Sequence, residues 1–264
     1  MRHSPVVPGV WSAPLAGGAD QDPPLVAVAH GSRDPRAAAV VEALLDEVRR
    51  ARPGLPVRTA YLDHAAPSLG QALAGLGEAV VLPLLLTEAY HSRVDLPAAL
   101  SEARARDARL RVRYGATLGP HPLLTAALER RLAEAGVAPR DPGTAVVLVS
   151  AGSSDARANA VVARMAGTWA RDGGWWATVP AYASAASPTP EQAVELLREA
   201  GAPRVAVAPY LLAPGLFADK VRRATLAAGA DVVADVLGPA PEVARVLLER
   251  YDAALRVPVG AAAS

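Results

Sequence analysis

The chain has 264 residues, a length that suits two domains of about 120 residues each. Hydrophobic residues make up 52% and aromatic residues only 4%, so the core must consist mostly of Ala, Val and Leu, as in α/β proteins. The net charge of +1 gives no overall attraction to nucleic acid or anionic membranes. The absence of cysteine excludes disulfides, thiolate zinc sites and protein-ligated iron–sulfur clusters, so any transition metal must bind His and carboxylate side chains.

The first 23 residues lack the features of a packed or targeting segment. Pro5, Pro8 and Pro14 interrupt each apolar stretch, so a signal-peptide core is missing and we expect residues 1–23 to form a disordered tail. No apolar run in the sequence reaches the roughly 20 residues that a membrane-spanning helix needs. These observations predict a cytoplasmic protein without a membrane partner.

Strand and helix patterns alternate along the first half of the chain. Apolar runs predict strands at residues 25–29, 57–61, 79–86 and 110–114. Amphipathic patterns and Pro residues predict helices at 35–51, from about 67, at 94–106 and at 122–135. The first of these helices begins at Pro35, with Asp34 as its expected N-cap.

The same alternation returns after a linker, GVAPRDPG at residues 136–143. Strands are expected near residues 145–149, 175–180, 205–209 and 232–236. Helices are expected near residues 155–171, 190–200, 218–228 and 241–255. The pattern predicts two flavodoxin-like α/β domains, residues 24–141 and 142–264, each a four-stranded parallel sheet flanked by helices with strand order 2-1-3-4.

Two short matches relate the halves to each other. AHGSRD at residues 29–34 aligns with SAGSSD at 150–155, after the first strand of each half. PLLL at residues 83–86 aligns with PYLL at 209–212, at the end of each third strand. We interpret the chain as a duplication that has diverged.

The histidines are distributed unequally between the halves. Each strand of the first half is followed by one histidine, in the order His30, His64, His91 and His121, whereas the second half contains none. Open α/β sheets bind ligands at the carboxyl ends of their strands. Ala151 aligns with His30, and Phe217 aligns with His91, while the loop glycine and serine are kept. This pattern indicates that the glycine and serine serve the shape of the loop in both halves, whereas the imidazoles take part in the chemistry of the first half.

We therefore expect His30 and His91 to bind a divalent metal ion, because neutral imidazole is a good ligand for iron, cobalt, nickel and zinc. The acidic residues Asp63 and Glu88 lie in the same group of loops and could complete the metal site or accept a proton. For His64 and His121 the sequence leaves both a chemical and a structural role open; His121, between two prolines, could simply start a helix.

The loop after His30 offers groups that could hold an anion. Gly31 and Ser32 lead into a helix amino terminus, whose backbone N–H groups could bind a carboxylate or phosphate; the alternative is a plain capped turn. Arg33 and Arg93 each lie just past one of the two histidines and could pair with substrate carboxylates; the alternative is two solvated surface arginines.

The ordered set of motifs resembles the sirohydrochlorin cobalto-/ferrochelatase family. The motifs are HGSRDP at residues 30–35, YLD at 61–63, PLLL at 83–86 and YHSRVDLP at 90–97. The chain is similar to the long two-domain form, in which only the N-terminal domain keeps both histidines. The resemblance implies a class II chelatase fold, a tetrapyrrole cleft between the halves, His30 and His91 as metal ligands, and a family acidic position at Asp63.

The expected function is that of a chelatase, a lyase that inserts Fe²⁺ or Co²⁺ into a sirohydrochlorin-type tetrapyrrole in siroheme or cobalamin biosynthesis. His30 and His91 would bind the metal, and Asp63 or Glu88 would accept pyrrole protons. The residues expected to bind the tetrapyrrole are Gly31, Ser32, Arg33, Ser92, Arg93 and Phe217. No organic cofactor is implied, because the chain has neither a P-loop nor a GxGxxG motif after a strand.

Two alternatives remain open at this point. A non-enzymatic carrier of metal or tetrapyrrole would use the same residues. A phosphohistidine-type phosphatase is suggested by a histidine and glycine after a strand, but such enzymes have an arginine before the histidine, where this chain has Ala29. In the chelatase interpretation the second half holds substrate, with Phe217 offering an apolar face, and has no metal site of its own.

Overall fold

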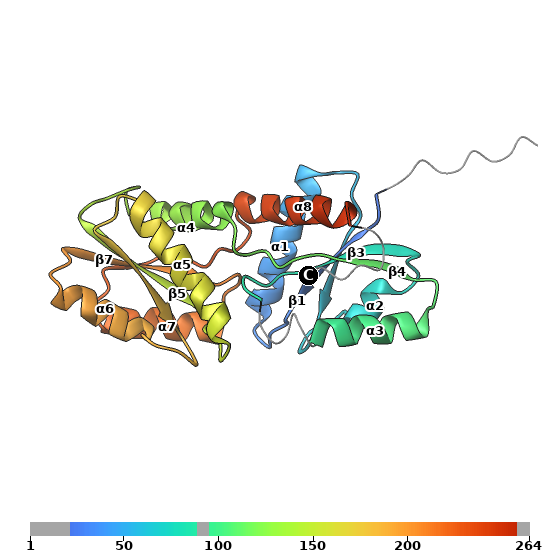
Figure 1. Ribbon diagram of the computed structural model, residues 1–264, viewed down its shortest axis with the longest axis horizontal. Helices are drawn as coiled ribbons and strands as arrows, with labels where there is room; N and C mark the ends of the chain where they lie inside the picture. The colour runs from blue at the N-terminus through green and yellow to red at the C-terminus, as the bar shows by residue number, and fades with distance from the viewer. Residues whose placement is uncertain (1–21, 89–94, 258–264) are drawn as a thin grey trace, which may run out of the picture.

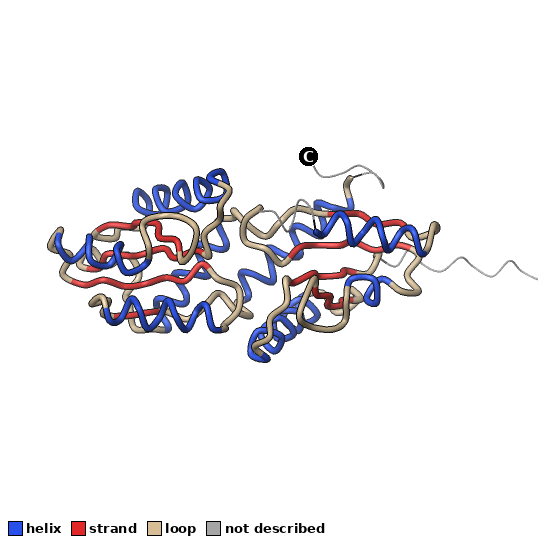
Figure 2. The backbone as a smooth tube through the Cα atoms, turned by 90° about the horizontal axis from the view of Figure 1, so that it is seen from below, coloured by secondary structure: helices blue, strands red, loops and turns tan. Residues whose placement is uncertain are grey.

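The structure is a computed structural model that describes residues 22–88 and 95–257. It contains two parallel sheets placed one after the other along the long axis of the molecule (Figure 1). In both halves the strands lie between layers of helices, as the view from below shows (Figure 2). This arrangement confirms the prediction of two α/β halves.

The elements of the first half are β1 (Leu25–Ala29), α1 (Pro35–Ala51), β2 (Val57–Tyr61), α2 (Leu69–Leu73), β3 (Glu78–Pro83), α3 (Leu96–Arg106), β4 (Arg111–Tyr114) and α4 (Pro122–Glu134). Those of the second half are β5 (Thr144–Ser150), α5 (Ala156–Asp172), β6 (Ala177–Tyr182), α6 (Pro190–Glu199), β7 (Arg204–Tyr210), α7 (Leu216–Ala227), β8 (Val232–Val233) and α8 (Pro241–Leu255). The strand orders are β2-β1-β3-β4 and β6-β5-β7-β8, so both sheets have the expected flavodoxin-like order.

Several strand boundaries differ from the sequence prediction: β8, for example, ends at Val233 rather than residue 236. Two of the differences have a visible cause. β3 ends at Pro83 rather than residue 86, because the chain then turns toward the segment before α4, where the Leu85 carbonyl accepts the Leu118 N–H at 2.9 Å. β6 begins at Ala177 rather than residue 175, because Trp175 is buried against Trp169 with their rings nearly perpendicular. Apolar character alone could not separate these loop residues from strand residues.

The last helix of each half packs on the sheet of the other half. α8 contacts α1, β3 and β4, and α4 contacts β7; α4 and α8 also contact each other. One hydrophobic core therefore runs through both halves, from Leu25 on β1 to Leu148 on β5. The opposite faces of the two sheets have separate cores, under α2 and α3 in the first half and under α6 and α7 in the second. Residue 141 thus separates two sequence repeats that exchange a helix.

Equivalent arginines hold this helix exchange in place. Arg131 on α4 donates to the Leu237 carbonyl at 2.8 Å, and Arg250 on α8 donates to the Leu118 carbonyl at 3.2 Å. Each leucine lies a few residues before the helix that the other arginine comes from. The two contacts occupy equivalent positions in the two repeats, which supports the interpretation of a duplication.

The shared core leads to a stability prediction. Leu128 on α4 and Leu247 on α8 are equivalent and fully buried in it. We expect Leu247→Ala to lower the free energy of unfolding by about 2–5 kcal/mol and to destabilise both halves together. In a Trp11→Phe background every remaining tryptophan lies in the second half, so tryptophan fluorescence reports that half and far-UV circular dichroism reports both.

Urea unfolding followed by both signals should give coincident transitions, shifted equally by Leu247→Ala and by the matched variant Leu128→Ala. A fluorescence transition that stays at its wild-type midpoint in Leu247→Ala, while the dichroism signal shifts, would show that the two halves unfold independently.

Candidate metal and tetrapyrrole site

The carboxyl ends of both sheets face the middle of the molecule. The amino ends of α1, α3, α5 and α7 converge there, at the lower centre of Figure 1. This is the edge where parallel α/β sheets bind ligands. It contains the loop after β1, with His30, and the beginning of the loop after β3, with Glu88.

The loops after β1 and β2 are joined closely by their backbones. The Asp63 N–H donates to the His30 carbonyl at 2.9 Å. Gly31 has φ +94°, and a Cβ at this position would lie 1.7 Å from the Asp63 carbonyl oxygen. Only glycine fits here, and the tight contact holds two predicted site residues, His30 and Asp63, next to each other with exposed side chains.

The second half repeats this loop without the histidine. Gly152 has φ +81°, and a Cβ there would lie 1.9 Å from the Ser184 carbonyl oxygen. Ser32 and Ser153 both accept a backbone N–H at 3.0 Å, from Asp34 and Asp155 respectively. The glycine–serine turn is therefore a structural feature of both halves, and His30 is what the first half adds to it.

Asp34 occupies the amino terminus of α1. Its carboxylate caps the helix by accepting the Arg36 N–H at 3.0 Å, as expected from the sequence. Arg36 also binds Asp34 and Asp219 with its guanidinium, at 2.6 Å each, and these hydrogen bonds lower the pKa of both carboxyl groups. The pair with Asp219 connects α1 to α7, so one side of the region between the halves is closed by an ion pair.

Glu88 lies beside a phenol that the sequence analysis did not select. Burial raises the pKa of Tyr114 to about 12, and the negative charge of Glu88 contributes to the rise. Tyr114 is the last residue of β4, at the same edge as the other candidates. Its position at the end of a predicted strand is the sequence feature that could have identified it. Its phenol is protonated at neutral pH, because its pKa lies well above 7.

Two further histidines have defined contacts. His121 is the N-cap of α4: its Nδ1 accepts the Leu123 N–H at 3.2 Å, and its Nε2 lies 3.1 Å from Glu249. This geometry supports the structural role left open by the sequence. His64 has φ +60°, and its Nδ1 lies 3.3 Å from the Asp63 carboxylate. An imidazole thus contacts a predicted proton acceptor.

Part of the predicted site lies outside the described residues: His91, Ser92 and Arg93 fall in residues 89–94. Within residues 22–88 and 95–257, no three His, Asp or Glu side chains are grouped so that they could hold a metal ion. The metal site therefore stays a prediction that needs His91 as well as His30.

Two apolar side chains and one arginine of the second half face solvent at the amino ends of its helices. Leu216 and Phe217 begin α7 with 80% and 40% of their surface exposed, and a Cβ at Gly215 before them would lie 4.0 Å from the Asp34 side chain. Arg157 on α5 is the repeat counterpart of Arg36, but it has no ion-pair partner among the described residues. The alignment of AHGSRDPR at residues 29–36 with SAGSSDAR at 150–157 could have identified Arg157 as the counterpart of Arg36.

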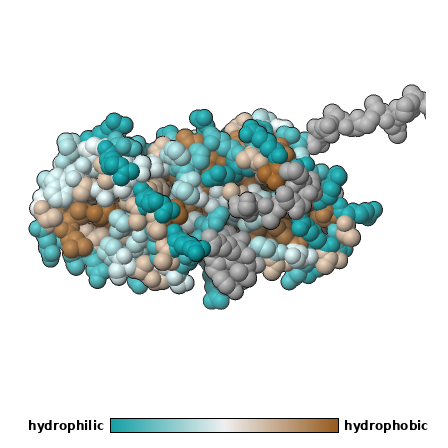
Figure 3. Space-filling view, in the orientation of Figure 1, coloured by the Kyte–Doolittle hydropathy of each residue, from teal (hydrophilic) through white to brown (hydrophobic). Residues whose placement is uncertain are grey.

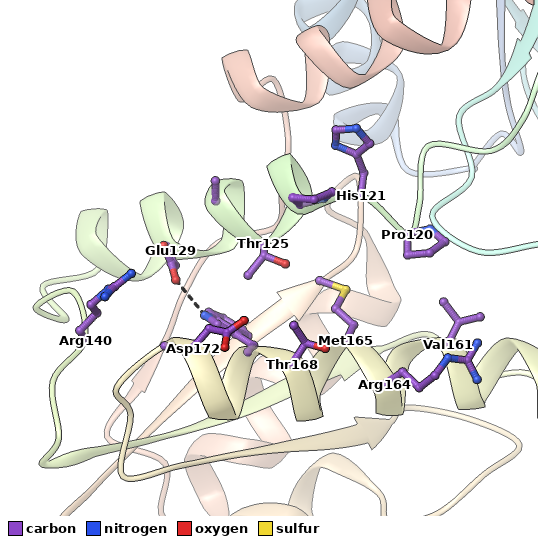
Figure 4. A pocket seen from close by; sticks show the side chains of 14 residues that line it. Pro120, His121, Thr125, Glu129, Arg140, Val161, Arg164, Met165, Thr168 and Asp172 are labelled. Carbon is purple, nitrogen blue, oxygen red and sulfur yellow. Dashed lines mark hydrogen bonds between the residues drawn. The ribbon is translucent and has the colours of Figure 1, made fainter. Parts of the chain in front are cut away.

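A groove of about 680 Å³ lies elsewhere, between α4 and α5 (Figure 4). Met165 and Trp169 line it, and the Trp169 indole donates to Glu129 at 2.9 Å. None of the residues predicted to bind metal or substrate lines this groove. In the described parts of the chain no helix is long and apolar enough to cross a membrane, and the face in Figure 3 mixes hydrophilic and hydrophobic residues.

The duplicated turn provides a matched pair of variants. We expect Gly31→Ala and Gly152→Ala to destabilise the protein by similar amounts, at least about 1 kcal/mol each, because both place a Cβ against a carbonyl oxygen. Only Gly31→Ala should weaken Co²⁺ binding, by about ten- to a hundredfold, since it moves the backbone next to His30, the predicted metal ligand. Calorimetric titration with Co²⁺ measures this, and equal loss of affinity in both variants would contradict it.

Comparison with known proteins gives a consistent result. A protein-family model, CbiX, matches residues 24–135 and 145–254, one match for each half. The sirohydrochlorin cobaltochelatase of Priestia megaterium is 28% identical over 196 residues, which cover 72% of this chain and 64% of that protein, just under two thirds of its length. The sirohydrochlorin ferrochelatase of the same organism is 26% identical over 201 residues, covering 74% of this chain and 75% of that protein. The structure of SirB from Bacillus subtilis with Fe³⁺ has the same fold, with a TM-score of 0.78 at 23% identity over 89% of this chain and 96% of that chain.

Proposed function

Because the chain belongs to the CbiX family, we propose that it inserts Fe²⁺ or Co²⁺ into a sirohydrochlorin-type tetrapyrrole. One observation carries the proposal: two loops of the same geometry follow β1 and β5, and only the first presents an imidazole, His30 in place of Ala151. The similarity to one cobaltochelatase and one ferrochelatase supports both metals equally. Neutral imidazoles do not select between them, because both metals bind nitrogen ligands well.

The reaction exchanges two pyrrole protons for one divalent metal ion, so the site must hold the metal and accept protons. His30 and His91 hold the metal substrate through imidazole nitrogens. Asp63 and Glu88 are exposed carboxylates, one joined to His30 through its backbone and one three residues before His91. They accept the pyrrole protons and pass them to solvent.

The tetrapyrrole binds between the two halves of the chain. Its carboxylates pair with Arg33, Arg93 and Arg157. Within residues 22–88 and 95–257, Arg157 has no ion pair like those of Arg36 with Asp34 and Asp219. Gly31, Ser32 and Ser92 shape the two histidine loops around it. Phe217, exposed at the start of α7, contacts the flat face of the ring. The second half in this proposal binds substrate, and the protein has one metal site per chain.

With this activity we expect the protein to act in the cytoplasm, in the synthesis of siroheme or cobalamin, with the tetrapyrrole and the metal ion as its partners. The carrier alternative uses the same residues and differs in turnover. With metal and sirohydrochlorin both in excess, an enzyme forms many equivalents of product, and a carrier forms no more than one.

Removal of the described imidazole tests the metal assignment. We expect His30→Ala to reduce insertion at least a hundredfold while leaving the unfolding midpoint unchanged, because the side chain is exposed. The absorbance change of sirohydrochlorin, with Fe²⁺, Co²⁺ and Ni²⁺ supplied separately, measures insertion. His121→Asn is the control, since asparagine keeps the N-cap acceptor and should keep activity. Full activity in His30→Ala would overturn the assignment.

Replacement of the apolar side chain at the start of α7 tests the role of the second half. Phe217→Ala should raise the KM for the tetrapyrrole about three- to tenfold, as expected for the loss of one aromatic contact, with the Co²⁺ stoichiometry staying at one per chain. Leu226→Ala removes a similarly exposed side chain, 46% against 40%, from the other end of α7 and should leave the KM unchanged. Two equivalent Co²⁺ sites per chain, or equal KM values in both variants, would count against this role.

A further inference from the structure

We propose that Tyr210, from the half without histidines, is a positioning residue that holds Leu86 at the start of the β3–α3 loop of the other half and thereby sets the affinity for the metal. This inference rests on the proposed function, because that loop contains Glu88 and His91. Tyr210 is the last residue of β7 and is only 2% exposed. Its hydroxyl donates to the Leu86 carbonyl at 3.1 Å, five residues before His91.

The repeat shows that this contact is particular to one loop. The counterpart of Leu86 is Leu212, whose carbonyl accepts the backbone N–H of Gly238 at 2.9 Å, a bond within its own half. The Leu86 carbonyl accepts a hydroxyl from the other half instead. The counterpart of Tyr210 is Leu84, which has no side-chain donor. The contact from across the molecule is thus found at Leu86, in the half that has the histidine, and its counterpart Leu212 bonds within its own half.

The packing around this hydrogen bond is tight. Gly119 lies between the two partners, and a Cβ there would lie 2.1 Å from the Tyr210 hydroxyl and 2.2 Å from the Leu86 carbonyl oxygen. The segment around Gly119 is held in turn by Arg250 of α8, which donates to the Leu118 and Pro120 carbonyls at 3.2 Å each. The exchanged helix therefore supports the same junction.

The hydroxyl can act as a donor throughout the neutral pH range. Burial raises the pKa of Tyr210 well above its ordinary value, so the phenol keeps its proton. The Leu86 carbonyl, partly buried beside it, gains a partner that solvent would otherwise have to supply. Loss of the hydroxyl would leave the Leu86 carbonyl, at the start of the loop, without this hydrogen bond. The aromatic ring would still fill its place in the core.

The test compares Tyr210→Phe with Tyr182→Phe. Tyr182 also ends a strand, is 5% exposed, and donates its hydroxyl to a backbone carbonyl, that of Asn159, at 3.0 Å, but this bond lies within the second half. We expect similar small losses of stability in both variants. Only Tyr210→Phe should weaken the binding of Co²⁺ alone, and raise the KM for the metal, by about three- to tenfold, with the KM for the tetrapyrrole unchanged.

Hydrogen–deuterium exchange separates this inference from the proposed function. Faster exchange in the peptide covering residues 84–96, in Tyr210→Phe and not in Tyr182→Phe, is expected whatever reaction the protein catalyses. Exchange of that peptide at the wild-type rate, or Co²⁺ affinity lowered equally in both variants, would overturn the positioning role. A wild-type protein that binds Co²⁺ but does not insert it would overturn the proposed function and leave the positioning role standing on the binding and exchange data.

Discussion

The exchange of α4 and α8 is the constraint on which the rest of the structure depends. Each sheet would expose an apolar face without the last helix of the other half, because that helix buries it. Burial of these faces in one shared core fixes how the two halves stand relative to each other. The region between the carboxyl ends of the two sheets is therefore part of a single packed unit, and residues from both halves can act on one ligand with fixed spacing.

Within this frame the two halves have the same backbone features and different chemistry. The turns at Gly31 and Gly152, the caps at Asp34 and Asp155, and the exchanged arginines are all present twice. The differences lie in side chains at the shared edge. Arg36 is paired with Asp219 on one side, while Arg157 on the other lacks an acidic partner among the described residues. An ion pair thus closes one side. On the other side the described structure gives Arg157 no such partner, as its proposed contact with an anionic substrate requires.

The sequence was sufficient for the fold and for half of the candidate site. Alternating strands and helices, with short matches such as HGSRD and AGSSD, predicted both sheets, their order and the repeat, because these depend on local patterns. The position of His30 followed from its place after β1. The helix exchange could not be predicted, since Leu128 and Leu247 would look the same in a helix that packs on its own sheet. The contact of Tyr210 with Leu86 spans 124 residues and involves a backbone carbonyl, so no side-chain motif reveals it.

The exchanged helices also bear on how such a chain could have arisen. Helix exchange between two equivalent units is the geometry of a domain-swapped homodimer, here with both partners in one polypeptide. In a dimer of identical chains every residue occurs twice, so a histidine at one loop would be a histidine at the other. Once the two copies are joined by the linker at residues 136–143, each can mutate separately. Fusion of two such copies would therefore allow His30 to face a half with Ala151, and would let a symmetric pair of loops take the two different roles that the proposed function gives them.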